Sequence, residues 1–208
     1  MILPAFFDSR KTLQLFGQKN NFNFFKDLLT KNKFPSVTML SGKKGIGKLT
    51  LINHLMFFYF DIKYYDLKIN KLSKKSSLYL QILENSYPGI IYLDGSKFKN
   101  IKIEDVRNLR QNLQKTSIID KKKFVIFDDV ETFNHNSLNA LLKVIEEPGK
   151  NIHFILINNE TKDLLNTIKS RSLEFKIILN KDQNKNIIKS LTDHYNQKIV
   201  LNEELINI

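Results

Sequence analysis

The residues with the clearest capacity for chemistry lie in a glycine-rich stretch, SGKKGIGKLTL, at positions 41–51. A glycine loop between a strand and a helix points backbone N–H groups at the phosphates of a nucleotide, and a lysine at its end reaches the terminal phosphates. An apolar strand candidate precedes this stretch and an apolar helix candidate follows it, so we predict a nucleotide-binding loop. The residues expected to line it are Gly42, Gly45, Ile46, Gly47, Lys48, Leu49 and Thr50.

One position of this loop departs from the usual pattern. The pattern requires a serine or threonine directly after the lysine, where its hydroxyl holds Mg²⁺. Here Leu49 follows Lys48, and Thr50 comes one residue late. One step along a helix turns a side chain by about 100°, so Thr50 cannot replace the missing ligand without a shift in register. We therefore expect binding of ATP and Mg²⁺ to be weak or absent.

Polar side chains follow two later strand candidates. Asp128 and Asp129 come directly after the apolar run 124–127, as the acidic residues of a Walker B motif do. The first would hold Mg²⁺ or its water, and the second would activate the attacking water, although Asp129 is one methylene shorter than the usual glutamate. The alternative is a polar rim at the end of a strand. Asn158 closes the next strand, where it would either orient water or begin a turn.

Other kinds of catalytic site find no support in the residue types. The four histidines, His54, His135, His153 and His194, show no spacing typical of metal ligands. Cysteine is absent, which excludes disulfides and thiolate zinc sites. No Ser/His/Asp or Cys/His arrangement is suggested, so we expect neither a resident metal nor zinc.

The elements that must position these residues follow an alternating pattern. Continuous apolar strands separated by helices indicate a five-stranded parallel sheet in an α/β domain. A change in composition near Asn180 suggests a core at 1–179 and the start of a small helical unit at 180–208. We expect strands at 37–40, 90–93, 124–127, 154–157 and 173–179, helices at 49–60, after an N-cap at Ser77, at 103–113 and at 137–145, and a flexible loop at 63–75.

Composition limits the class of protein. The apolar fraction of 42% argues against disorder, and no run of ~18 apolar residues suggests a membrane span. The N-terminus, MILPAFFDSR, lacks signal-peptide features, so we expect a cytoplasmic protein. A net charge of +12 fits a nucleic-acid partner or, equally, the bias of an AT-rich coding sequence. Lys102, Arg107 and Arg110, on or beside a predicted amphipathic helix, are candidates for DNA contact, and a solvated helix face is the alternative.

Three stretches together resemble a known family. They are FDD at 127–129, NALLKVIEEP at 139–148 and TIKSRS at 167–172, where Ser172 replaces the cysteine of an S-R-C motif. They are similar to the clamp-loader branch of AAA+ proteins. SRKTL at 9–13 and GIGKLT at 45–50 further resemble delta-prime subunits of bacterial DNA polymerase III, many of which have G-I-G-K-A-T in the loop. The resemblance covers roughly residues 4–179 and therefore implies an AAA+ P-loop domain followed by a helical lid.

The resemblance implies a function in DNA replication. A subunit of this kind works in a hetero-oligomeric ring with the other clamp-loader subunits, and loads the sliding clamp on primed DNA. Its own ATPase activity is expected to be absent, while Arg171 would act in trans as a finger in a neighbour's active site. The alternative for Arg171 is a surface arginine paired with a carboxylate such as Glu174. This chain cannot form the zinc module of some relatives, and it stops at Ile208, early in the lid and before any collar domain. An active motor-type ATPase and a truncated remnant without function stay open as alternatives.

Overall fold

The structure is a computed structural model that describes residues 8–95, 109 and 122–195. The chain divides into two compact units. One comprises residues 1–34, 44–86 and 177–208, and the other comprises 35–43 and 87–176. We call them the helical unit and the sheet unit.

The sheet unit is built on a five-stranded parallel sheet in the order β4-β5-β6-β1-β7. This confirms the predicted parallel sheet. The strands are β1 (Val37–Ser41), β4 (Ile90–Asp94), β5 (Lys123–Asp128), β6 (Ile152–Asn158) and β7 (Leu173–Lys176). The last strand is shorter than the predicted 173–179, because its partner β1 turns into the glycine loop after Ser41, which pairs with Lys176.

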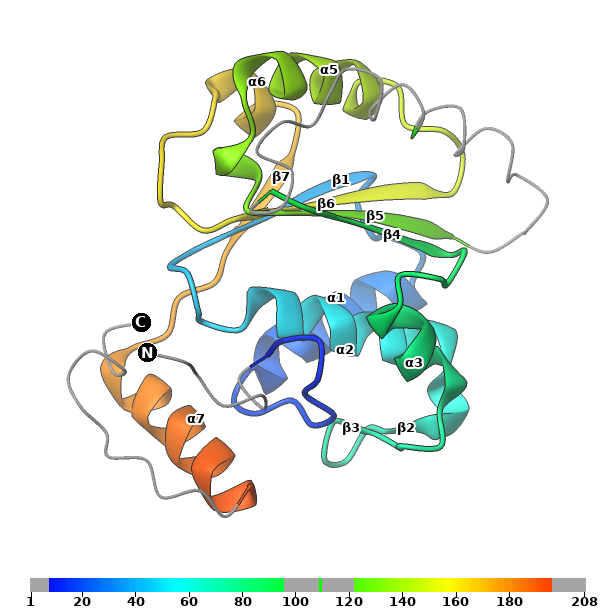
Figure 1. Cartoon of the computed structure of the whole chain (residues 1–208), viewed down its shortest axis with the longest axis vertical. Coiled ribbons are helices and arrows are strands. Elements are labelled where there is room, and N and C mark those ends of the chain that lie inside the picture. Colours follow the sequence, from blue (N-terminus) through cyan, green and yellow to red (C-terminus); the bar gives the residue numbers. More distant parts are fainter. Residues whose placement is uncertain (1–7, 96–108, 110–121, 196–208) are drawn as a thin grey trace. The chain divides into compact units, whose positions relative to one another are not determined.

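The apolar runs of the sequence explain which strands are central. All five residues of β1 are buried, as are all but the first of β6 and all but the last of β5. The edge strand β7 is mostly exposed. Helices α5 (His135–Ile145) and α6 (Asn166–Lys169) lie on the same side of the sheet (Figure 1). Their core with the strands includes Phe127, Leu141, Phe154 and Ile168.

The helical unit contains α1 (Lys19–Thr30), α2 (Lys48–Phe60), α3 (Ser77–Leu83) and α7 (Lys181–His194). Helix α2 matches the predicted helix at 49–60 and is buried on nearly all sides. Helix α1, which the sequence analysis did not identify, buries Phe22, Phe25 and Leu29. Helix α7 confirms the helical prediction after Asn180, whose side chain forms a capping box with Gln183. The proposed domain boundary at 179/180 stays a prediction.

The expectation of a loop at 63–75 is wrong. This segment contains the end of a 3-10 helix (Ile62–Tyr64) and two short antiparallel strands, β2 (Tyr65–Asp66) and β3 (Lys71–Leu72). Charge and tyrosine content suggested a loop, but Tyr65 and Leu72 are 6% and 0% exposed and anchor the hairpin.

The structure bears differently on the N-cap predicted at Ser77 and on the helix predicted at 103–113. Ser77 is the first residue of α3 rather than its N-cap; Ser76 stands at the cap, and its hydroxyl donates to the Asp61 carboxylate instead of capping the helix. The helix predicted at 103–113 falls outside the described residues apart from Leu109, which is buried in the core of the sheet unit.

Candidate functional site

Within the glycine loop the chain passes from one unit to the other, since Gly42 and Lys43 belong to the sheet unit and Lys44 belongs to the helical unit. Gly45 and Gly47 have φ of 90° and 87°, a region that side chains with a Cβ rarely adopt. Gly47 occupies the N-cap position of α2. In the helical unit, Gln18 Nε2 donates to the carbonyl oxygen of Ile46 at 2.7 Å and so holds the second half of the loop.

The first turn of α2 places the residues on which nucleotide chemistry would depend. Lys48 begins the helix and is 3% exposed. Leu49 is 9% exposed and is one of the helix's buried apolar side chains, whereas Thr50 is only half-buried. The position that usually carries a magnesium-binding hydroxyl is therefore apolar and packed.

Asp128 ends β5 with both carboxylate oxygens engaged. Tyr92 donates its hydroxyl to Oδ2 at 2.8 Å, and the backbone N–H of Asp129 donates to Oδ1 at 3.0 Å. Burial raises the pKa of the Asp128 carboxyl, and the neighbouring charges of Asp129 and Asp94 add to that effect. The hydrogen bonds from Tyr92 and from the Asp129 backbone favour the charged form and oppose the rise.

Asp129 has a left-handed backbone conformation, with φ of 50°, and is 5% exposed. Asn159 Nδ2 donates to its Oδ1 at 2.5 Å. The sequence analysis singled out Asn158 and missed Asn159. No signal in the sequence separates two adjacent asparagines at the end of one strand, because only the turn that follows decides which side chain faces Asp129.

Asn158 has another task in the structure. Its Oδ1 accepts a hydrogen bond from the backbone N–H of Glu160 at 3.0 Å, which stabilises the turn after β6. Its main-chain oxygen accepts from the N–H of Gly42 at 3.3 Å. Asn158 therefore supports the chain at the start of the glycine loop, while Asn159 contacts the acidic residue.

A second contact links the same two segments. Thr161 donates its hydroxyl to Oε1 of Glu131 at 2.8 Å, and Glu131 is 4% exposed. The other oxygen of Glu131, Oε2, is buried and has no hydrogen-bond partner among the described residues. The segment 159–161 is thus held to the segment 129–131 by two side-chain hydrogen bonds, in which Asp129 and Glu131 are the acceptors.

Arg171 lies just before β7 and contacts the end of α5. Its Nε donates to Oε1 of Glu146 at 2.7 Å, and its Nη1 donates to the carbonyl oxygen of Thr167 at 3.2 Å. The sequence alone suggested Glu174 as the type of carboxylate that would pair with this arginine. The structure pairs it with Glu146, which belongs to the NALLKVIEEP stretch and was not identified as a site residue.

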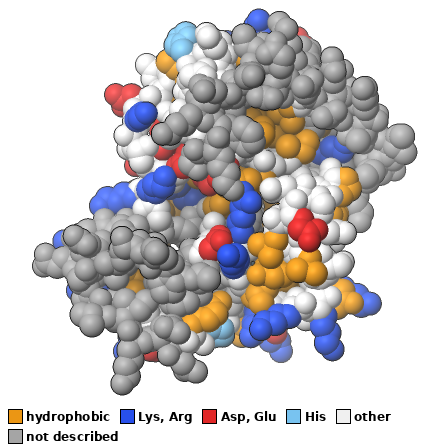
Figure 2. Space-filling model, viewed as in Figure 1, with side chains coloured by type: hydrophobic (Ala, Val, Ile, Leu, Met, Phe, Trp, Pro, Cys, Tyr) orange, Lys and Arg blue, Asp and Glu red, His pale blue; other side chains and the backbone are white. Residues whose placement is uncertain are grey.

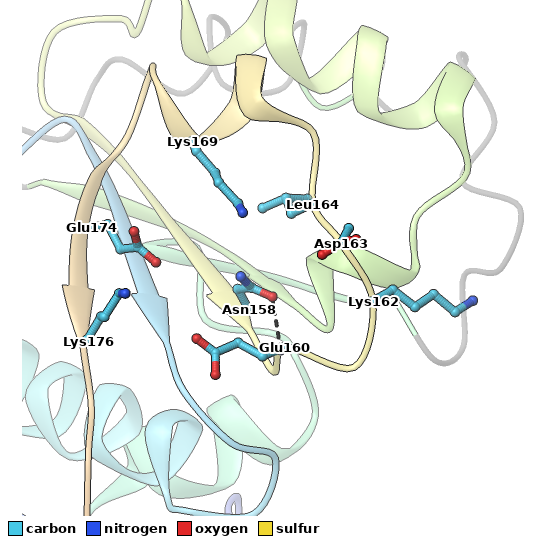
Figure 3. A pocket seen from close by; sticks show the side chains of 8 residues that line it. All are labelled: Asn158, Glu160, Lys162, Asp163, Leu164, Lys169, Glu174 and Lys176. Carbon is cyan, nitrogen blue, oxygen red and sulfur yellow. Dashed lines mark hydrogen bonds between the residues drawn. The ribbon is translucent and has the colours of Figure 1, made fainter.

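A polar pocket of about 300 Å³ lies beside these segments in the sheet unit. Figure 3 shows Lys169 from α6 and Glu174 and Lys176 from β7 pointing into it. The residues that line it are Asn158, Glu160, Lys162, Asp163, Leu164, Lys169, Glu174 and Lys176. Three lysines oppose three acidic residues, so the charge of the lining selects neither an anion nor a cation.

Lys102, Arg107 and Arg110, the candidates for DNA contact, lie outside the described residues. On the face drawn in Figure 2, Lys and Arg side chains are scattered, with acidic side chains among them. Across residues 8–95 and 122–195, no group of three histidine or acidic side chains is arranged to hold a metal ion. None of the helices seen in the structure is long and apolar enough to cross a membrane.

The fold places the protein in a class. The structure is similar to the RuvB branch migration motor of Thermotoga maritima, with a TM-score of 0.56 at 14% identity over 90% of this chain and 55% of that one. It is also similar to the Orc1 protein of Aeropyrum pernix, with a TM-score of 0.57 at 13% identity over 92% and 52% of the two chains. At such low identity these likenesses show the fold alone, which is the α/β domain of AAA+ proteins.

The sequence comparisons define the family within this class. Residues 17–181 match the model of the family described as DNA polymerase III, delta subunit, and the chain belongs to this family. The resemblance to clamp-loader subunits inferred from the NALLKVIEEP and TIKSRS stretches is thereby confirmed.

Curated relatives carry the names of different DNA polymerase III subunits. The subunit gamma of Buchnera aphidicola is 28% identical over 182 residues, which cover 86% of this chain and 48% of that protein. The subunit delta' of Pseudomonas aeruginosa is 37% identical over 76 residues, which cover 36% of this chain and 23% of that protein. The chain therefore spans less than half the length of these relatives.

Proposed function

We propose that the chain is a delta-prime-type subunit of a DNA polymerase III clamp loader. It does not hydrolyse ATP itself. It takes its place in a hetero-oligomeric ring in the cytoplasm, where the ring loads a sliding clamp on primed DNA, and it lends Arg171 to the nucleotide site of a neighbouring subunit. Membership of the family supports a function in the clamp loader. The site residues support a subunit that supplies Arg171 to a neighbour and does not hydrolyse ATP itself.

The observation that carries this proposal is Leu49 in the first turn of α2. Mg²⁺ takes oxygen ligands in near-octahedral geometry, and a leucine offers none. Since Leu49 is itself buried, a rotation of α2 that brought Thr50 into its place would expose apolar surface. The backbone amides of the loop and Lys48 would at most hold a nucleotide without positioning its metal ion.

The acidic residues support the same conclusion. Asp129 is buried, and one of its two carboxylate oxygens, Oδ1, is engaged within the chain by a hydrogen bond from Asn159. The shorter side chain of aspartate also reaches less far than the usual glutamate. In contrast, Arg171 is 39% exposed at the side chain, so a partner can reach it. An arginine is always charged, and its planar fork of N–H groups suits phosphate oxygens.

Steady-state hydrolysis of Mg²⁺-ATP by the purified chain tests the first part. We expect no phosphate release above that of a Lys48→Ala control, because the metal cannot be held for phosphoryl transfer. Turnover that Lys48→Ala abolishes would refute a non-catalytic subunit. Leu49→Ser alone is not expected to restore activity, since Asp129 stays engaged by Asn159.

Reconstitution tests the second part. A loader assembled with Arg171→Ala in this chain only is expected to lose DNA-stimulated ATP hydrolysis by roughly a thousandfold at the site that the arginine serves, as in other phosphoryl-transfer systems that lose such a finger. Size-exclusion chromatography of the mutant ring is the control for assembly. Unchanged hydrolysis and clamp loading in an intact ring would remove Arg171 from the mechanism.

A motor-type subunit that hydrolyses ATP is the second candidate. The relative named gamma covers 86% of this chain, whereas the relative named delta' covers 36%. The intact Gly45, Gly47 and Lys48 also favour it. The hydrolysis assay above separates the two candidates. Co-purification with the remaining loader subunits separates both from a remnant without function.

A further inference from the structure

Two stretches that mark the family in the sequence meet through one pair of side chains. Glu146 belongs to NALLKVIEEP and Arg171 to TIKSRS, and their side chains approach to 2.7 Å between Oε1 and Nε. The two residues are 25 positions apart and lie in the same unit. This contact therefore depends on the packing of α5 and α6 and is not a local feature of either stretch.

The hydrogen bonds of Arg171 within the chain engage two of the three guanidinium nitrogens. A guanidinium has five N–H donors spread over Nε, Nη1 and Nη2. Glu146 engages Nε, and the carbonyl oxygen of Thr167 engages Nη1. Among the residues that the structure describes, no hydrogen-bond partner is recorded for Nη2. The protein's own groups thus hold Nε and Nη1, whereas the Nη2 group has donors available to a ligand that comes from outside the chain.

A gain in the stability of the fold does not explain why residue 146 is acidic. Glu146 is the C-cap residue of α5, where the helix dipole disfavours a negative charge. The side chains of Glu146 and Arg171 are 45% and 39% exposed, and ion pairs with this exposure add little to the stability of a protein. A positioning role provides the missing reason, because a long arginine side chain that is ordered in advance loses less entropy when it binds.

We propose that Glu146 is a positioning residue for Arg171. It holds the Nε–H group of the guanidinium so that the adjacent Nη2 group faces a phosphate on a neighbouring subunit. This inference rests on the proposed function of Arg171 and adds a residue to it. Misplacement of a catalytic group by a small distance lowers the rate while leaving the chemistry in place.

Glu146→Gln tests this role in the reconstituted loader. Glutamine keeps an acceptor oxygen but removes the charge that strengthens the bond to Nε. We expect DNA-stimulated kcat to fall roughly tenfold, with KM for ATP little changed, and so to remain well above that of Arg171→Ala. Glu146→Asp should recover part of the loss, since its carboxylate is charged but shorter. The matched control is Glu174→Gln on β7, which makes the same change of charge, whereas the partners of Arg171 in the described part of the chain are Glu146 and Thr167.

A double mutant separates positioning from a structural effect. If Glu146 acts only through Arg171, Glu146→Gln has no further effect in the Arg171→Ala background, whereas a structural role lowers activity in both backgrounds. In the isolated chain, the ¹⁵N signal of Arg171 Nε should lose its protection from exchange in Glu146→Gln and keep it in Glu174→Gln.

Each outcome decides one of the two proposals. A normal defect in Arg171→Ala together with full activity in Glu146→Gln overturns the positioning role alone, and so does an additive double mutant. If Arg171→Ala leaves hydrolysis unchanged, the proposed function fails and the positioning role fails with it. An Nε signal that does not respond to Glu146→Gln shows that the contact itself is absent in solution.

Discussion

His54 connects three segments of the helical unit through its two ring nitrogens. Nε2 lies 3.2 Å from the carbonyl oxygen of Thr12, and Nδ1 lies 2.9 Å from the hydroxyl of Tyr65. Because a carbonyl oxygen only accepts, Nε2 carries the hydrogen and Nδ1 accepts from the tyrosine. The imidazole is 0% exposed, so both hydrogen bonds depend on its being neutral.

This arrangement makes stability depend on pH. Burial lowers the pKa of His54 from 6.5 to about 3, and the bond to Thr12 opposes the shift only in part. Between pH 6.5 and pH 3 the unfolded chain therefore binds a proton at His54 that the folded chain does not bind. The stability that the neutral imidazole contributes is present above pH 6.5 and is lost as pH falls toward 3. Linkage predicts a loss of about 1.4 kcal/mol on going from pH 7.5 to about 5.5.

Urea unfolding of the wild type and of His54→Gln at these two pH values measures the effect. The variant is expected to be less stable at neutral pH, because it loses well-formed buried hydrogen bonds. Its stability should depend less on pH, by the amount predicted for His54. His153, whose pKa burial also lowers, titrates in both proteins and is therefore controlled for. Equal pH dependence in the two proteins would contradict this account of His54.

Among the elements, α7 depends on a glycine in the N-terminal segment. Gly17 has φ of 79°, and a Cβ at this position would come within 2.4 Å of Ile187 on α7. The neighbouring Phe16 packs its ring against His194 at 5.3 Å between centroids, near the other end of the same helix. A small residue at position 17 therefore permits the close approach of α7 to the segment before α1.

Gly17→Ala is expected to destabilise the helical unit by about 1–2 kcal/mol, because alanine is strained in a left-handed conformation. The clash with Ile187 adds to this cost. In an Ile187→Ala background the clash is absent, so Gly17→Ala should cost less there. Chemical denaturation of the wild type, Gly17→Ala, Ile187→Ala and the double variant measures the cost of the backbone strain and the cost of the clash. Equal costs in the two backgrounds would show that α7 does not approach Gly17 in solution.

For the whole molecule, the relevant quantity is the net charge of +12. We expect DNA binding to be electrostatic and insensitive to sequence, since contacts from lysines and arginines to phosphates suffice. Titration of labelled duplexes over a series of salt concentrations should show affinity falling steeply, with log K linear in log salt. Replacing Lys102, Arg107 and Arg110 together should reduce that slope.

Two results would contradict this prediction. One is binding that changes little with salt, and the other is a strong preference among duplexes of equal length and different sequence. A matched replacement of three described surface lysines, Lys63, Lys68 and Lys74, is the control. It removes the same charge from the hairpin region of the helical unit. If both triple variants reduce the slope equally, net charge rather than a defined contact accounts for binding.

The central architecture of this protein could be predicted from its amino-acid sequence. Long apolar runs at 37–40, 124–127 and 154–157 predicted the buried strands, because a run that is apolar on both faces is stable only inside a parallel sheet. The signatures at 139–148 and 167–172 predicted the family. These features are local, since each depends on residues that are neighbours in the chain.

The side-chain contacts of the site, in contrast, became known only from the packing of elements that are distant in the chain. Arg171 pairs with Glu146 rather than with Glu174. Asp129 accepts a hydrogen bond from the side chain of Asn159, whereas the side chain of Asn158 accepts one from the backbone of Glu160. The hairpin at 65–72 likewise exists because Tyr65 and Leu72 are buried by residues distant in sequence. Side-chain partners depend on how separate elements pack and on the turns that join them, and many pairings of the same residue types satisfy one sequence equally well.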